Sequence, residues 1–99
     1  DNFEESSPIQ YGIAKSAQLH LTKELAVRLA PEVRVNAVSY GGIKGRVDAE
    51  FQARYKSLTP MQKMLEEEDV IGPIEFLVSD NSKDITGQNI PVDGGWTIW

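Results

Sequence analysis

Residues 33–43 read Val-Arg-Val-Asn-Ala-Val-Ser-Tyr-Gly-Gly-Ile, and this stretch decides the fold class. Its first part alternates in polarity and is rich in β-branched side chains, which predicts a strand over 33–39. Two glycines follow at the carboxyl end of that strand, where they allow a sharp exit and a close approach of backbone to a ligand. Ligands bind at this edge of open α/β sheets, although without further context a simple turn is the commoner explanation.

A long helix is predicted immediately before this strand. Ser7 is a good N-cap and Pro8 suits the first helical position, so residues 1–6 are expected to form a loop. The helix runs to about Ala30, where Pro31 stops it. A helix that leads so directly into a strand is half of an α/β unit. One face of the helix is expected to be buried, because apolar residues recur at spacings of three and four: Ala14, Ala17, Leu21, Leu25 and Leu29.

A loosely helical insertion, residues 46–68, follows the glycine pair. Residues 48–55 can form a short helix with Phe51 and Tyr55 on one face, and Thr59-Pro60 predicts a second helix start leading into 61–65. Insertions of this length beyond a strand end often cover a binding site.

The rest of the chain predicts a helix and an edge strand. The acidic run 66–69 is a solvated helix start rather than a metal site, and the helix continues to Val78. Residues 85–92 form a short strand, and Pro91 places it at the edge of the sheet because proline has no N–H to donate. Residues 96–99 form an apolar tail.

Tyr11 and Lys15 are the strongest candidates for chemistry. Residues four apart lie on one helix face, so the phenol and the ammonium can point at a common ligand. A nearby positive charge favours the phenolate and lowers the pKa of a tyrosine from about 10 towards neutrality, which suits an acid/base catalyst. Taken alone, an ordinary surface tyrosine and lysine is the commoner explanation, so the surrounding motifs decide.

Composition excludes several classes of function. The net charge is −5 and the ten basic residues are scattered, which argues against a nucleic-acid surface. The sequence has no cysteine, which excludes a disulfide framework. It has one histidine, which makes a metal site improbable. No apolar run approaches the roughly 20 residues of a membrane span. The expectation is one small cytoplasmic domain.

The motifs, in this order and at these spacings, resemble the carboxyl-terminal part of a short-chain dehydrogenase/reductase. The resemblance covers Ser7 to Gly95 and implies part of a Rossmann-type doubly wound parallel α/β sheet. It is carried by Tyr11-x-x-x-Lys15, Arg34-Val-Asn36-Ala-Val38, Gly41-Gly42-Ile43, Phe76-Leu-Val-Ser-Asp80, Ile85-Thr-Gly87 and Val92-Asp-Gly-Gly95.

The resemblance implies an enzyme that interconverts an alcohol and a carbonyl with NAD or NADP. Tyr11 would be the acid/base, and Lys15 would bind the nicotinamide ribose and lower the tyrosine pKa. The backbone from Tyr40 through Gly41 and Gly42 to Ile43 would flank the nicotinamide, with Ile43 meeting its carboxamide. Residues 46–68 would be the substrate loop.

Two residues depart from the family pattern, and other motifs are absent. Tyr40 stands where the family usually has proline, and Gly45 where it often has threonine. The glycine-rich phosphate loop and the catalytic serine would lie upstream of Asp1, which is not a methionine. Residues 1–99 are therefore expected to be the carboxyl-terminal fragment of a single Rossmann-like domain, without its cofactor-binding half and inactive by itself.

Physical reasoning also favours a fragment or an assembly. Two parallel strands leave sheet faces and an edge uncovered, so the chain is not expected to be self-sufficient. By resemblance it would form a homodimer or homotetramer through the helix from Pro8 and the region from Asp69 to Trp99. Two alternatives remain open: a catalytically idle relative that binds a nucleotide or partner, and a module that only oligomerises.

Overall fold

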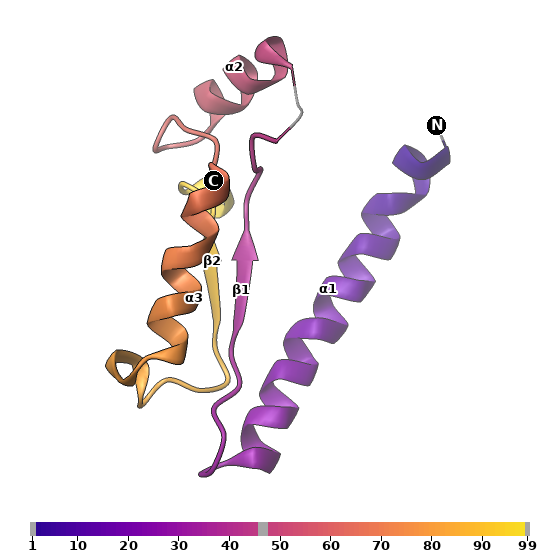
Figure 1. Ribbon diagram of the computed structural model, residues 1–99. Helices are drawn as coiled ribbons and strands as arrows, with labels where there is room; N and C mark the ends of the chain where they lie inside the picture. Colours follow the sequence, from indigo (N-terminus) through magenta and orange to yellow (C-terminus); the bar gives the residue numbers. More distant parts are fainter. Residues whose placement is uncertain (1, 46–47, 99) are drawn as a thin grey trace. The chain divides into compact units, whose positions relative to one another are not determined.

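The computed structural model describes residues 2–45 and 48–98 (Figure 1). The chain divides into two compact units: a first unit of residues 1–37 with 85–88, and a second unit of residues 38–84 with 89–99. The elements are α1 (Asn2–Leu29), β1 (Ala37–Tyr40), α2 (Ala49–Leu58), α3 (Ile71–Val78) and β2 (Asn89–Val92), with short 3₁₀ helices η1 (Glu67–Val70), η2 (Asp80–Ser82) and η3 (Trp96–Ile98).

Helix α1 begins at Asn2, so the prediction of a loop over 1–6 and a helix start at Pro8 was wrong. The proline is then accommodated within the helix instead of opening it. The other boundary agrees with the prediction: α1 ends at Leu29, just before Pro31.

The predicted apolar face of α1 is not buried within this chain. Leu21 is 55% exposed and Leu29 41% exposed, whereas Thr22 and Ala26 are buried. The loop 85–88 packs on the helix in this unit, and a Cβ at Gly87 would lie 3.4 Å from the Ala26 Cβ. An apolar stripe of this kind requires a partner surface, which the first unit does not provide along most of the helix.

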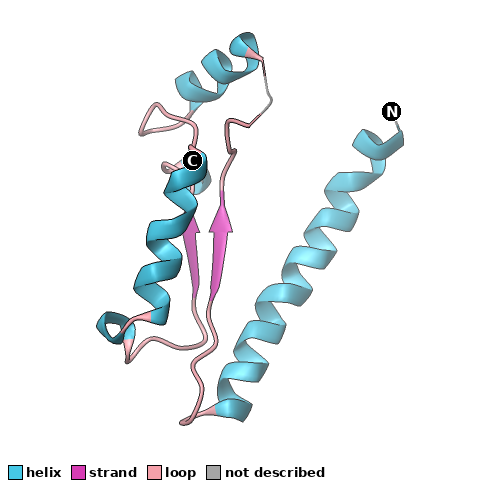
Figure 2. Ribbon diagram, viewed as in Figure 1, coloured by secondary structure: helices cyan, strands magenta, loops and turns pink. Residues whose placement is uncertain are grey.

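Strands β1 and β2 pair in parallel and form a two-stranded sheet, which confirms the α/β class (Figure 2). The Gly41 N–H donates to the Val92 carbonyl at 2.9 Å just beyond the strands. Both strands are shorter than predicted. In the residues that precede them, backbone groups form hydrogen bonds with side chains as well as with the neighbouring backbone. The Val35 N–H donates to the Thr86 hydroxyl at 3.0 Å, and the Asn36 amide donates to the Ile85 carbonyl at 2.9 Å.

The insertion after β1 contains one helix instead of two. Residues 46 and 47 lie outside the described part of the chain; α2 follows them, capped by Asp48, whose carboxylate accepts the Phe51 N–H at 2.7 Å. The second predicted helix, 61–65, was wrong. Gln62 adopts φ +56°, which ends the turn begun at Thr59, and Leu65 then forms a parallel bridge with Ile43.

The acidic run begins a helix, as predicted. The Glu66 N–H donates to the Asp69 carboxylate at 2.8 Å, and the Glu66 side chain accepts the Asp69 N–H in return, which makes a capping box. η1 then leads directly into α3. None of the described helices is long and apolar enough to cross a membrane.

Candidate active site

Helix α1 carries the predicted catalytic pair. Tyr11 and Lys15 are one turn apart and therefore leave the helix from the same face. The Tyr11 side chain is 66% exposed and Lys15 is half-buried. A Cβ at the intervening Gly12 would meet nothing within 4 Å, so the backbone beside the pair is open to a ligand.

The predicted cofactor-binding residues, 40–43, begin at Tyr40, the last residue of β1, and lie in the second unit. The Leu65 N–H donates to the Gly42 carbonyl at 2.9 Å, and the Lys44 N–H donates to the Leu65 carbonyl at 2.8 Å. In a parallel bridge these bonds are made by the residues on either side of Ile43, so its own N–H and carbonyl point away from Leu65. The structure thus holds the backbone on both sides of Ile43 and turns its N–H outward.

The two glycines are required by close packing and do more than form a turn. A Cβ at Gly41 would lie 2.8 Å from the Asp93 Cβ, and a Cβ at Gly42 would lie 2.8 Å from the Tyr55 ring. Both distances are shorter than carbon atoms tolerate. Any other residue at either position would displace the neighbouring segment.

The two departures from the family pattern have local structural causes. The Tyr40 phenol donates to the Val70 carbonyl at 2.7 Å, so it ties the end of β1 to the beginning of α3. Gly45 has φ +45°, a left-handed conformation that a threonine would adopt only with strain. Tyr40 was predicted to bind cofactor, and its hydroxyl here makes an internal contact.

Tyr55 and Trp96 belong to this region, although the sequence did not single them out as site residues. The Tyr55 phenol oxygen accepts the Gly42 N–H at 2.6 Å. Its ring stacks on Trp96 with centroids 4.7 Å apart and planes at 8°. The sequence signal was the position of Tyr55 beside Phe51 on one face of α2, and nothing in the sequence indicated which backbone that face would meet.

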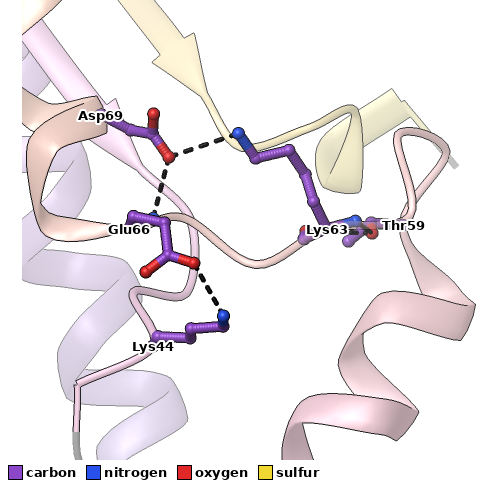
Figure 3. A network of polar contacts seen from close by, with 5 residues as sticks. All are labelled: Lys44, Thr59, Lys63, Glu66 and Asp69. Carbon is purple, nitrogen blue, oxygen red and sulfur yellow. Dashed lines mark hydrogen bonds and ion pairs between the residues drawn. The ribbon is translucent and has the colours of Figure 1, made fainter.

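A polar network holds the end of the insertion beside the strand end (Figure 3). Lys44 pairs with Glu66 at 2.7 Å, and Lys63 pairs with Asp69 at 3.3 Å. The Glu66 N–H, and next the Lys63 ammonium, lower the pKa of Asp69 from its ordinary value of 3.8. The hydroxyl of the buried Thr59 accepts the Lys63 N–H at 3.2 Å. These contacts bring the chain back to the strand end.

A cavity of about 390 Å³ lies in the same unit, a volume within the range of small-molecule sites. Polar and apolar groups both line it, and two of them are the paired Lys63 and Asp69. The full lining is Met61, Lys63, Leu65, Asp69 and residues 91–95. Among the described residues no cluster of acidic or histidine side chains could hold a metal ion.

The predicted site residues therefore fall into two groups. Tyr11 and Lys15 share α1 in the first unit, and residues 40–43 share the strand end in the second unit. Within the second unit the structure adds Tyr55 and Trp96 to the strand end. Each group is defined by contacts within its own unit.

Comparison with known sequences identifies the family. The profile of a family described as enoyl-(acyl carrier protein) reductase matches residues 3–97. Post-translational flagellin modification protein A of Campylobacter coli is 36% identical over 102 residues, which cover 99% of this chain and 40% of that protein. The NADP-dependent mannitol dehydrogenase of Hypocrea jecorina is 34% identical over 91 residues, covering 88% of this chain and 34% of that protein.

Solved structures agree with the sequence comparison. A short-chain dehydrogenase from Leptospira borgpetersenii with bound NAD⁺ superimposes with a TM-score of 0.81 at 40% identity, covering 88% of this chain and 35% of that one. 4-Hydroxyisoleucine dehydrogenase complexed with NADH gives a TM-score of 0.78 at 33% identity, with coverage of 90% and 38%. The chain belongs to the short-chain dehydrogenase/reductase family and has part of its Rossmann-like fold. It spans about 34–40% of the length of the two sequence relatives.

Proposed function

We propose that this chain is the carboxyl-terminal part of an NAD(P)-dependent oxidoreductase that interconverts an alcohol and a carbonyl. The observation that carries the proposal is the Tyr11/Lys15 pair, which shares one face of α1 in a chain of this family. Relatives named as dehydrogenases, and the solved relatives with NAD⁺ or NADH, support the reaction class and the cofactor class.

Tyr11 acts as the acid/base in this proposal. Its phenol exchanges a proton with the substrate oxygen, giving the proton during carbonyl reduction and taking it during alcohol oxidation. Lys15, one turn away, binds the nicotinamide ribose in this proposal. The nicotinamide supplies or accepts the hydride when it is bound. The helix face holds both side chains where one ligand can reach them.

The strand end supplies the second part of the proposed cofactor site. Gly41 and Gly42 let Asp93 and Tyr55 pack directly against the backbone that leads into Ile43. The outward N–H of Ile43 suits the carboxamide oxygen, because a fixed backbone donor can bind that acceptor without reorganisation. Tyr40 contributes backbone only, since its hydroxyl is bonded to Val70.

The rest of the enzyme is proposed to lie upstream of this chain. The chain spans 33–40% of the length of curated relatives, and the exposed stripe of α1 requires a covering surface. The upstream part would contain the phosphate-binding loop and the catalytic serine. We expect the parent protein to be a cytoplasmic homo-oligomer that uses α1 and the region 69–99, and the 99 residues to be inactive alone.

Tyr11→Phe in the full-length protein tests the proposal. We expect kcat to fall by about 10²- to 10⁴-fold, because removal of the phenol removes the acid/base, while NADH binding is retained. Turnover is measured by NAD(P)H absorbance against a panel of secondary alcohols and ketones. Lys23→Met is the matched control, because Lys23 is an exposed cation two turns further along α1.

Three outcomes contradict parts of this proposal. Unchanged kcat in Tyr11→Phe refutes the acid/base role. Cofactor binding by the wild-type protein without turnover on any alcohol or ketone favours a catalytically idle relative. A wild-type protein that binds neither NAD(H) nor NADP(H) favours a module that only oligomerises.

A further inference from the structure

We propose that Tyr55 is a positioning residue, whose phenol oxygen fixes the Gly41–Gly42 peptide and so helps to hold the next peptide, which carries the Ile43 N–H, in the orientation that faces the nicotinamide carboxamide. The inference rests on the proposed function, because it concerns how the same cofactor site is held. It assigns a role to a residue on α2, outside the strand end that would contact the cofactor.

The backbone contacts show what Tyr55 adds. The Gly42 carbonyl accepts the Leu65 N–H at 2.9 Å, which anchors one side of this residue. The Gly42 N–H has no backbone partner of that kind and instead donates to the Tyr55 Oη at 2.6 Å. With both polar groups of Gly42 bonded, the peptides on both sides of its Cα are held: Tyr55 holds the Gly41–Gly42 peptide and Leu65 holds the Gly42–Ile43 peptide. In this arrangement the Ile43 N–H points away from Leu65.

The phenol ring is itself held by two neighbours. Trp96 stacks on one face of it at 4.7 Å with nearly parallel planes. The Gly42 backbone lies close to the ring, since a Cβ at Gly42 would lie 2.8 Å from Cε2 and 2.9 Å from Cζ. These contacts restrict the ring and keep the phenol oxygen where the Gly42 N–H can reach it.

The hydroxyl also fits this role chemically. A phenol oxygen has lone pairs that can accept a backbone N–H. A phenylalanine preserves the ring and the stack but leaves the Gly42 N–H without its acceptor. Tyr55→Phe therefore removes the positioning contact alone.

The test compares two ligands that differ at the nicotinamide. NADH carries the carboxamide that would receive the Ile43 N–H, and ADP-ribose lacks the whole nicotinamide ring. In the full-length protein we expect Tyr55→Phe to raise the Kd for NADH about 3- to 10-fold, the usual effect of one hydrogen bond. The Kd for ADP-ribose is expected to stay unchanged. Both values are measured by titration calorimetry.

Ser57→Ala is the matched control. It removes a hydroxyl from the same helix, and that hydroxyl bonds to the Arg54 carbonyl at 2.8 Å within α2. We expect both ligands to bind the control variant as they bind the wild-type protein. Equal weakening of NADH and ADP-ribose by Tyr55→Phe would indicate general structural damage and overturn the inference, as would unchanged NADH binding.

Amide hydrogen exchange at Gly42 tests the contact without any cofactor. We expect the Gly42 N–H to exchange faster in Tyr55→Phe than in the wild-type protein, because its acceptor is gone. Unchanged exchange overturns the inference by itself. A wild-type protein that binds neither ligand refutes the proposed function instead, and the two failures are therefore distinguishable.

Discussion

The two regions proposed to form the active site are built in opposite ways. The Tyr11/Lys15 pair depends on local geometry: four residues of α1 bring the side chains to one face. The strand end at 41–43 depends on residues far along the chain, since Tyr55, Leu65 and Asp93 all touch it. One region is held by the helix alone, and the other is held by long-range contacts.

The two regions are therefore expected to respond differently to the same change. Among the described residues, a Cβ added at Gly12 of α1 meets no neighbour within 4 Å. A substitution at the strand end disturbs segments from three parts of the sequence. Glycine provides the most direct comparison, because each region has one beside the proposed site residues.

Gly42→Ala is expected to have the largest effect. The added Cβ would lie 2.8 Å from the Tyr55 ring and 3.0 Å from the Met64 side chain. Ring and backbone must separate, and overpacking of this kind lowers the free energy of unfolding by about 2–3 kcal/mol. Chemical denaturation of the full-length protein measures this effect, and NADH titration is expected to show weaker binding.

Gly12→Ala is the control for that prediction. A Cβ at this position meets nothing within 4 Å, and alanine is the better helix former by about 0.5–1 kcal/mol. We expect the free energy of unfolding to rise or stay constant. Destabilisation by Gly12→Ala comparable to that of Gly42→Ala would show that the two regions do not differ as described.

Thr59→Val is expected to have the next largest effect. Thr59 is 2% exposed, and its hydroxyl accepts the Lys63 N–H at 3.2 Å and lies 3.3 Å from the Lys63 carbonyl. Valine keeps the shape and leaves the part-buried Lys63 N–H without this acceptor, which costs about 1 kcal/mol. The free energy of unfolding measures the loss. Thr59→Ser keeps the hydroxyl and is expected to cost less; an equal cost would assign the effect to packing.

The sequence predicted the local features well. The i, i+4 pair, the helix end before Pro31 and the helix start in the acidic run are set by neighbouring residues. A short strand after the long helix followed from the alternation over 33–39. These features require no knowledge of what lies elsewhere in the chain.

Apart from the start of α1, which lies six residues earlier than predicted, the features that the sequence did not predict depend on distant partners. The contact of Tyr55 with Gly42 joins α2 to the strand end. Helical periodicity predicts which face of α2 is apolar, but it does not predict which segment packs against that face. Leu21 and Leu29 were expected to be buried because the pattern is amphipathic, but the pattern cannot say that the covering surface lies outside these residues. The helix predicted at 61–65 failed because Leu65 pairs with Ile43.

The smallest predicted effect concerns Asp69. Its partners, Glu66 and Lys63, are close to it in the sequence. The Glu66 N–H and then Lys63 lower its pKa below the ordinary value of 3.8. A lowered pKa means that the carboxylate stabilises the fold at pH values above 3.8, and that this contribution is lost as the pH falls through the folded-state pKa. Asp69→Asn is therefore expected to be less stable than the wild-type protein near neutral pH.

Unfolding measured at a series of pH values checks this expectation. The difference between the wild-type protein and Asp69→Asn is constant above about pH 5 and shrinks in the acid range, where the wild-type carboxyl is also neutral. Glu67→Gln, a neighbouring exposed carboxyl, controls for the change in net charge and is expected to show no such convergence. A difference that persists unchanged into acid would mean that the cap depends on side-chain shape. In that case charge at Asp69 would contribute nothing to the start of α3, and local electrostatics would have no part in holding the second unit.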